Sequence, residues 1–267
     1  MEAAGLRAEV TTALGTAAAA AGARLLLIRR PGRHPVVPGR PHRWGIAAVP
    51  EPVGPVGGVA GPVGGVIWGE WRRDSELLDV ELGATLPAFD PSRQRPVALV
   101  CTHGRHDLCC AIEGRPVAAV AAADPDVDAW ECSHLGGDRF AGNLLFLPTG
   151  LLFGGLSAAD TPAVLAAARD GRVRLPHFRG RCGDSIPAQA AQWFLMRELG
   201  EDRPDRVVVD EVDVVPGRTV VAVARHGVAR YRIRLVVGRT EPARLTCRAR
   251  GDGRAWTYRL DAPPARF

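Results

Sequence analysis

Three cysteines and two histidines lie within ten residues, in the segment VCTHGRHDLCCAIEG that runs from Val100 to Gly114. The whole chain has only six cysteines and seven histidines, so this segment holds half of its thiols. Thiolates and imidazoles bind zinc and iron–sulfur clusters, and paired thiols can exchange with disulfides. The segment therefore predicts metal binding or redox chemistry.

A second segment, WECSHLGGDRFAGN, follows about twenty residues later and adds Cys132 and His134. Both segments begin where an apolar, strand-like run ends, and loops after strand ends often carry functional groups. Cys132 and His134 are two residues apart, so a strand would point both side chains the same way. Together the loops offer enough donors for a four-ligand site: Cys101, Cys109, Cys110, Cys132, His134 and Asp138. Spacing alone does not choose between zinc and an iron–sulfur cluster.

The remaining thiols and imidazoles are expected to have supporting or structural roles. An isolated cysteine usually behaves as a small buried hydrophobe, and we expect this of Cys182 and Cys247. We interpret His103 and His106 as polar loop residues that support the ligands. Two ion pairs are expected to brace the loops, Arg105 with Asp107 and Asp138 with Arg139. Alternatively, Arg139 contacts an electron-transfer partner.

The elements that must position these residues are those of an α+β domain at residues 96–203. The patterns predict a strand ending at Cys101, a helix in GRPVAAVAAAD, a strand in DAWECSH and a hairpin formed by GNLLFLP and GLLFGG. A helix follows in SAADTPAVLAAARDG, and another in IPAQAAQWFLMREL. The order β, α, β, β, β, α is that of a thioredoxin-like fold.

The segments on either side of this domain differ from it in composition and in hydrophobic pattern. Residues 1–95 begin with an Ala-rich helix and continue through RLLLIRR, a strand-like run, into Pro- and Gly-rich stretches that predict loops, PGRHPVVPGRPHRWG and VPEPVGPVGGVAGPVGGV. Residues 204–267 alternate apolar and polar side chains in RVVVDEVDVV, TVVAVARHG, ARYRIRLVVG, ARLTCRARG and AWTYRLDAP. This alternation predicts a small C-terminal antiparallel sheet that packs or docks a partner.

Composition excludes several classes of protein. The 34 basic residues are all arginine and give a net charge of +5, but they are spread along the chain without a basic run, so we do not expect nucleic-acid binding. No run of apolar residues is long enough to span a bilayer. The N-terminus makes a poor signal peptide, so we expect a cytoplasmic protein, in which clustered cysteines bind metals or take part in redox chemistry.

CTHGRHDLCC followed by WECSHLGGDRFAGNLLFLPTG resembles the sucrase/ferredoxin-like family, whose members carry a CTHG…CC loop and a later SHLGGDRF or SHLGGHRF loop. The match runs from about Leu99 to Gly155, with a looser echo in HFRGRCG and IPAQAAQ. The resemblance implies a thioredoxin-like ferredoxin that binds a [2Fe-2S] cluster and transfers single electrons to and from a redox partner protein.

In the fungal branch of this family, two cysteines with eight residues between them and two histidines with three between them hold the cluster. Cys101 and Cys110 match the cysteines, and His134 matches the first histidine. The second histidine position falls on Asp138, a harder and weaker ligand for cluster iron than thiolate or imidazole. Cys132 is the natural replacement, so we expect the ligands Cys101, Cys110, Cys132 and His134, with Asp138 or Cys109 as the alternative fourth.

Three other functions compete with this interpretation. A cluster-free thiol oxidoreductase could use Cys109 and Cys110, or Cys101 with either, although the chain lacks the C-x-x-C motif of such enzymes. A structural zinc module would use the same ligands without a redox partner. Sucrose hydrolysis would need a pair of positioned carboxylates, and no motif singles out such a pair, so no intrinsic catalytic activity is assigned.

Overall fold

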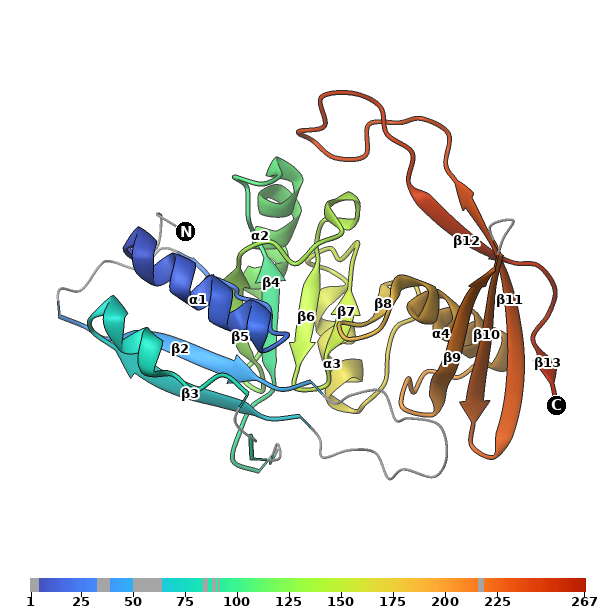
Figure 1. Ribbon diagram of the computed structural model, residues 1–267, viewed down its shortest axis with the longest axis horizontal. Helices are drawn as coiled ribbons and strands as arrows, with labels where there is room; N and C mark the ends of the chain where they lie inside the picture. The colour runs from blue at the N-terminus through green and yellow to red at the C-terminus, as the bar shows by residue number, and fades with distance from the viewer. Residues whose placement is uncertain are drawn as a thin grey trace.

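The structure, a computed structural model, describes residues 5–32, 39–49, 64–83, 86–87, 90, 92–215 and 219–267. Helices and sheets are mixed along the chain, which confirms the α+β class (Figure 1). The Gly- and Pro-rich stretch at residues 50–63, for which we predicted loops, lies outside the described residues.

A six-stranded sheet forms the centre, in the order β1-β5-β4-β6-β7-β8. Its strands are β1 (Ile28–Arg29), β4 (Val97–Cys101), β5 (Asp128–Cys132), β6 (Leu144–Leu147), β7 (Leu151–Phe153) and β8 (Phe178–Arg181). Strands β4 and β5 are parallel, and the other neighbours are antiparallel. β4 and β5 are buried along their whole length, as expected for strands covered on both faces.

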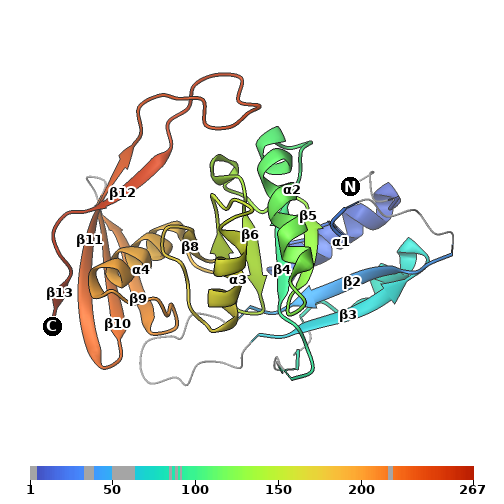
Figure 2. The ribbon, with the colours of Figure 1, turned by 180° about the vertical axis from the view of Figure 1, so that it is seen from behind.

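Helices cover one face of this sheet. α2 (Leu108–Ala123) crosses from β4 to β5, and α3 (Thr161–Arg169) follows β7, so the predicted order β, α, β, β, β, α is observed. α2 and α3 lie together on the side seen in Figure 2. Val100, Phe146 and Val117 meet there in the main hydrophobic core. No helix in the described part of the chain is long and apolar enough to cross a membrane.

The opposite face is covered by the N-terminal segment. This segment contains α1 (Ala8–Ala20), the 3₁₀ helix η2 (Asp74–Asp79) and a hairpin of β2 (His42–Ala47) and β3 (Val66–Trp71). We expected a loop at residues 42–45, and that expectation is wrong. Trp68 of β3 stacks on Trp130 of β5 with ring centroids 5.3 Å apart, so aromatic burial outweighs the local Pro- and Gly-rich composition.

The C-terminal residues form the predicted antiparallel sheet. Its strands are β9 (Val207–Val215), β10 (Thr219–His226), β11 (Ala229–Arg239), β12 (Trp256–Leu260) and β13 (Ala265–Arg266). The buried sides of β10 and β11 pack towards α4 (Ile186–Leu199), which lies between this sheet and the central one (Figure 1).

One predicted strand is missing from this sheet. ARLTCRARG, residues 243–251, lies in a long excursion between β11 and β12 that makes a single isolated bridge from Ala243 to Gly253. Its alternate apolar positions are mostly small side chains, which bury too little area to hold a strand against the core.

Candidate metal and redox site

Three thiols meet at one end of the central sheet. Cys101 and Cys132 are the last residues of the parallel strands β4 and β5 and are register partners, so their side chains lie side by side on the same face. Cys110, from the first turn of α2, is buried against both in one hydrophobic cluster. The structure therefore brings together the three cysteines that we expected as ligands.

The start of α2 is held close to the end of β4 by two features. Asp107 is the N-cap of the helix, and its carboxylate accepts the backbone N–H of Cys109 at 3.2 Å. Farther along the helix, a Cβ on Gly114 would lie 2.1 Å from the carbonyl oxygen of Cys101. Only glycine lets the helix and the strand approach this closely.

Burial makes two of these thiols, Cys110 and Cys132, poor acids. Desolvation raises the pKa of Cys110, and the neighbouring Cys101 thiol and Asp138 carboxyl raise it further. Desolvation also raises the pKa of Cys132 well above that of a free thiol, and Cys101 adds to the effect. At neutral pH, both groups are therefore neutral thiols unless a positive charge stabilises their thiolates.

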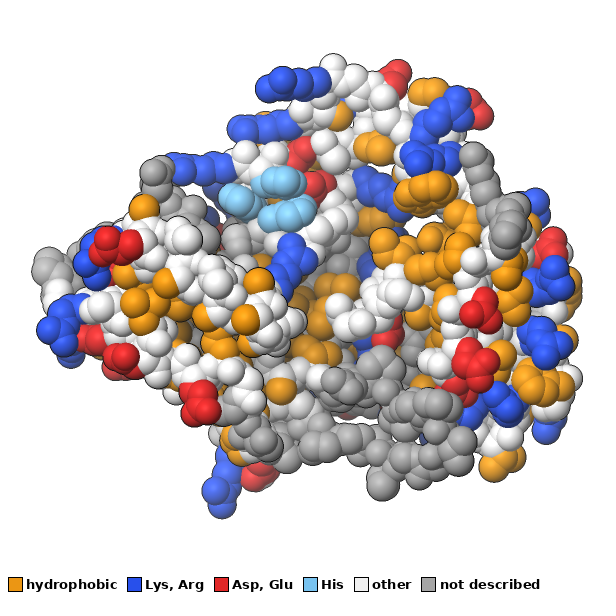
Figure 3. Space-filling model, in the orientation of Figure 1, with side chains coloured by type: hydrophobic (Ala, Val, Ile, Leu, Met, Phe, Trp, Pro, Cys, Tyr) orange, Lys and Arg blue, Asp and Glu red, His pale blue; other side chains and the backbone are white. Residues whose placement is uncertain are grey.

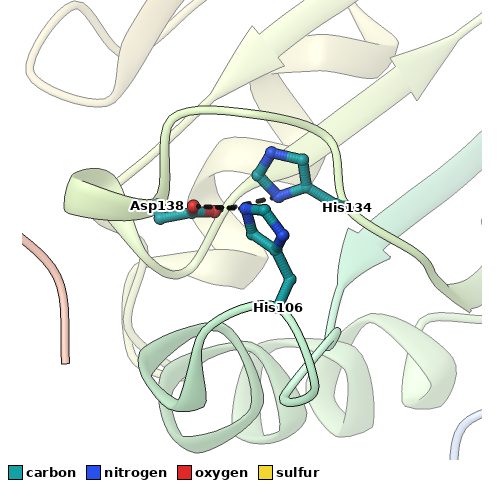
Figure 4. A group of neighbouring side chains, drawn as sticks. All are labelled: His106, His134 and Asp138. Atoms are coloured by element: carbon teal, nitrogen blue, oxygen red, sulfur yellow. Dashed lines mark ion pairs between the residues drawn. The ribbon is translucent and has the colours of Figure 1, made fainter. Parts of the chain in front are cut away.

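Beside the thiols, two imidazoles converge on one carboxylate (Figure 4). Nδ1 of His134 lies 2.9 Å from Oδ1 of Asp138, and Nε2 of His106 lies 3.1 Å from Oδ2. The ring centroids of His106 and His134 are 4.0 Å apart. The Sγ of Cys110 lies 3.3 Å from Oδ1 of Asp138, so this carboxylate contacts both the thiols and the imidazoles.

The loop that carries His134 is fixed by backbone contacts. Arg24 donates hydrogen bonds to the carbonyls of His134 at 2.7 Å and of Leu135 at 2.9 Å.

Burial lowers the pKa of His134, against the opposing effect of Asp138. Its Nδ1 is buried and, although close to Asp138, is not aligned for a hydrogen bond. A neutral imidazole nitrogen without a hydrogen-bond partner is able to bind a metal.

The histidine side of the site reaches the surface. The His134 side chain is 27 % exposed and the His106 side chain 49 %. Figure 3 shows histidines grouped with acidic side chains on this face, with arginines around them. The site is thus a buried group of thiols next to a partly exposed pair of imidazoles.

We expect His106 to have a supporting role, and the structure places it beside His134 and Asp138. Its ligand atom lies within 4.8 Å of theirs, and the three residues form a group that could hold a metal ion. The expected pairing of Asp138 with Arg139 is wrong, because Asp138 pairs with the two histidines while Arg139 donates to the carbonyl of Trp256. In the sequence, the only indication that His106 lies near the site is its position four residues before Cys110. The sequence does not reveal the direction in which the side chain of a loop residue points.

Two expectations about isolated cysteines are wrong. Cys247 is exposed and forms a disulfide with Cys109, 138 residues away in the sequence. Cys182 is also exposed and has a free thiol. The bond to Cys247 removes Cys109 from the thiols available in this state. Asp107 accepts backbone N–H groups of Cys247 and Arg248 instead of bracing Arg105.

Comparison with known proteins identifies the family. A search among curated proteins found no match, and neither did a search among solved structures. A family model described as sucrase/ferredoxin-like matches residues 37–180, which is more than half of the chain and includes both site loops. The chain therefore belongs to the sucrase/ferredoxin-like family.

Proposed function

We propose that this protein is a one-electron carrier that binds a [2Fe-2S] cluster through Cys101, Cys110, Cys132 and His134. The observation that carries the proposal is the convergence of three buried thiols from β4, β5 and α2. Thiolates are the usual ligands of iron–sulfur clusters, and imidazole replaces some of them in Rieske centres, so this site offers both donor types.

The chemistry of the donors fits this group. The thiols of Cys110 and Cys132 have raised pKa values because they are buried, and a bound metal cation favours their deprotonated forms. The buried Nδ1 of His134 has no hydrogen-bond partner. Hydrophobic neighbours such as Leu135 and Leu145 exclude water from the thiol side.

Two residues, Cys132 and Asp138, lie where a fourth ligand is needed. We favour Cys132 because its sulfur is buried with the other two, whereas Asp138 offers a hard carboxylate. Asp138 is supported as an alternative by its contacts with Cys110 and His134. Cys109 would become an alternative only after its bond to Cys247 is reduced.

When bound, the cluster would supply reversible one-electron transfer. This chain would hold it in a dry pocket and present His134 and His106 towards the surface, where a redox partner protein could approach. We place this chemistry in a thioredoxin-like domain, which is supported by the order of β4, α2, β5, β6, β7 and α3. We propose a cytoplasmic location. The proposal requires neither a membrane nor a nucleic acid.

The test is the metal content and colour of the purified protein. We expect iron and sulfide in equal amounts and visible absorbance between about 400 and 600 nm, as for [2Fe-2S] proteins. Cys110→Ser should lose both, because it removes a buried ligand. Cys182→Ser changes a free exposed thiol outside the site and should keep both.

A colourless protein that contains zinc would instead identify a structural zinc module. A colourless, metal-free protein that reduces disulfides would identify a thiol oxidoreductase. Either result contradicts the proposal.

A further inference from the structure

The excursion between β11 and β12, residues 240–255, reaches from the C-terminal sheet to the start of α2. We call it the strap. Figure 1 shows it leaving the sheet and extending towards the end of the molecule where α2 begins. At its base, Thr240 and Ala255 hydrogen-bond to each other. Farther out, the bridge between Ala243 and Gly253 keeps its two arms together.

The tip of the strap is attached to the candidate site by a few polar contacts and one covalent bond. The carboxylate of Asp107 accepts the N–H of Cys247 at 3.1 Å and that of Arg248 at 3.2 Å. The guanidinium of Arg248 donates to the carbonyl of Arg105 at 2.9 Å. The disulfide joins Cys247 to Cys109, the residue next to Cys110.

Without the disulfide, little else would hold the tip. Of residues 241–250, only Leu245, Thr246 and Ala249 are partly covered, and the others are exposed. The strap therefore buries little apolar surface, whereas ordering its backbone costs conformational entropy. The covalent bond keeps the tip next to Asp107 and so raises the effective concentration of the N–H groups that bind its carboxylate.

The disulfide is also accessible to chemistry. Cys247 is exposed, while Cys109 is partly buried in the first turn of α2. Exposed disulfides are the labile ones, and a cysteine at a helix N-terminus leaves more readily as a thiolate. The N–H of Cys247 lies 3.0 Å from the Sγ of Cys109 and favours the thiolate, whereas Oδ1 of Asp107, at the same distance, opposes it.

We propose that the Cys109–Cys247 disulfide is a site of reversible thiol–disulfide exchange, and that its redox state decides whether the strap is fixed to the candidate site. The reductant is a dithiol, either a small molecule or a protein. One of its thiolates attacks Sγ of Cys247, the Cys109–Cys247 bond breaks, and Cys109 leaves as a thiolate that takes up a proton.

The second thiol of the reductant then attacks the mixed disulfide and releases Cys247. The protein disulfide gains two electrons and two protons, and the reductant becomes a disulfide. Asp107 still accepts the N–H of Cys109 as the N-cap of α2, but the disulfide no longer holds the strap next to it. In a reducing compartment, such bonds form and break with redox conditions. This proposal does not depend on the cluster.

Limited trypsin digestion tests it, because the strap carries Arg244, Arg248, Arg250 and Arg254 as cleavage sites. The full-length protein is oxidised, the Cys109–Cys247 link is checked by non-reducing mass spectrometry, and dithiothreitol is then added. We expect strap cleavage to be faster by about tenfold or more after reduction, because cleavage follows local opening. Reoxidation should restore the slow rate.

Two variants sharpen the test. Cys247→Ser changes an exposed residue and should show fast strap cleavage with or without dithiothreitol. Cys182→Ser is the matched control, since it also removes one exposed thiol, and it should behave as the unmodified protein does.

Three outcomes would overturn the proposal: failure of the link to form on oxidation, equal strap cleavage rates in both redox states, or zinc that is bound at Asp107, Cys109 and Cys247 and lost in Cys247→Ser. The last outcome would make the pair metal ligands instead of a disulfide. None of these readouts uses iron, so failure here is distinguishable from failure of the proposed electron carrier.

Discussion

At the scale of single residues, Asp138 stands where the fungal branch of the family has a histidine, and its carboxylate contacts groups of both ligand types. It contacts the thiol of Cys110 and the imidazoles of His106 and His134. A carboxylate in this position can bind a metal or can hold the imidazoles in place by ion pairing. Substitution separates these two roles.

If Cys132 is the ligand, Cys132→Ser should lose most of the bound iron, while Asp138→Asn should keep it. Asp138→Asn should also raise the reduction potential, because removal of a nearby negative charge favours the more negative reduced state. Iron analysis, EPR and protein-film voltammetry measure these effects. Retained iron in Cys132→Ser together with lost iron in Asp138→Asn would assign the carboxylate as the ligand.

At the scale of elements, the site depends on how α2 meets β4. Asp107 caps the helix, which begins at Leu108, and Gly114 lets the following turns pack against the carbonyl of Cys101. These contacts place Cys110 beside Cys101. The position of one turn of helix therefore decides whether the thiols meet.

Gly114→Ala should lower the free energy of unfolding by about 1–3 kcal/mol, because a Cβ that cannot fit forces the helix away from the strand. Gly15→Ala in α1 is the matched control. A Cβ there has no neighbour within 4 Å, so this change should be neutral or stabilise by up to about 1 kcal/mol. Urea denaturation measures both, and equal effects would show that the close approach is not needed.

At the scale of the whole molecule, one hydrophobic core runs from the central sheet through α4 to the C-terminal sheet. Val100, Leu195 and Ile233 belong to this single cluster. Polar contacts reinforce the joint, since buried Gln192 of α4 donates to the carbonyls of Pro204 and Val207. Glu201, just after α4, pairs with His226 of β10 at 3.0 Å.

Glu201 should make stability depend on pH. Burial opposes its ionisation, but the N–H groups of Arg203 and Asp202 and the imidazole of His226 outweigh burial and lower its pKa. A lowered pKa in the folded state stabilises above the unfolded value of 4.5, and this contribution is lost as pH falls through the folded value. Glu201→Gln should therefore cost about 1 kcal/mol near pH 7.

The difference between Glu201→Gln and the unmodified protein should shrink as pH falls below 4.5 and through the lower pKa of the folded state, where the carboxyl becomes protonated. Urea denaturation of both proteins at several pH values measures this. A difference that stays constant across the range would mean that the charge of Glu201 does not stabilise the joint between α4 and β10.

The sequence by itself determined the features that depend on residues close together in the chain, namely the helices, the strands and the loops that follow them. Apolar runs and alternation predicted the central strands and helices, and the two motif loops predicted the grouping of Cys101, Cys110 and Cys132 at the ends of β4 and β5. Parallel strands joined by a helix end at the same edge of a sheet, so this grouping follows from local pattern and strand order.

Only the tertiary structure decided which groups face each other across long stretches of chain. It paired Cys109 with Cys247, brought His106 to Asp138, and removed residues 243–251 from the C-terminal sheet. No local pattern encodes such contacts, because each depends on where an exposed loop ends in space. Loop direction is set by packing and backbone hydrogen bonds that form only when the distant elements have come together.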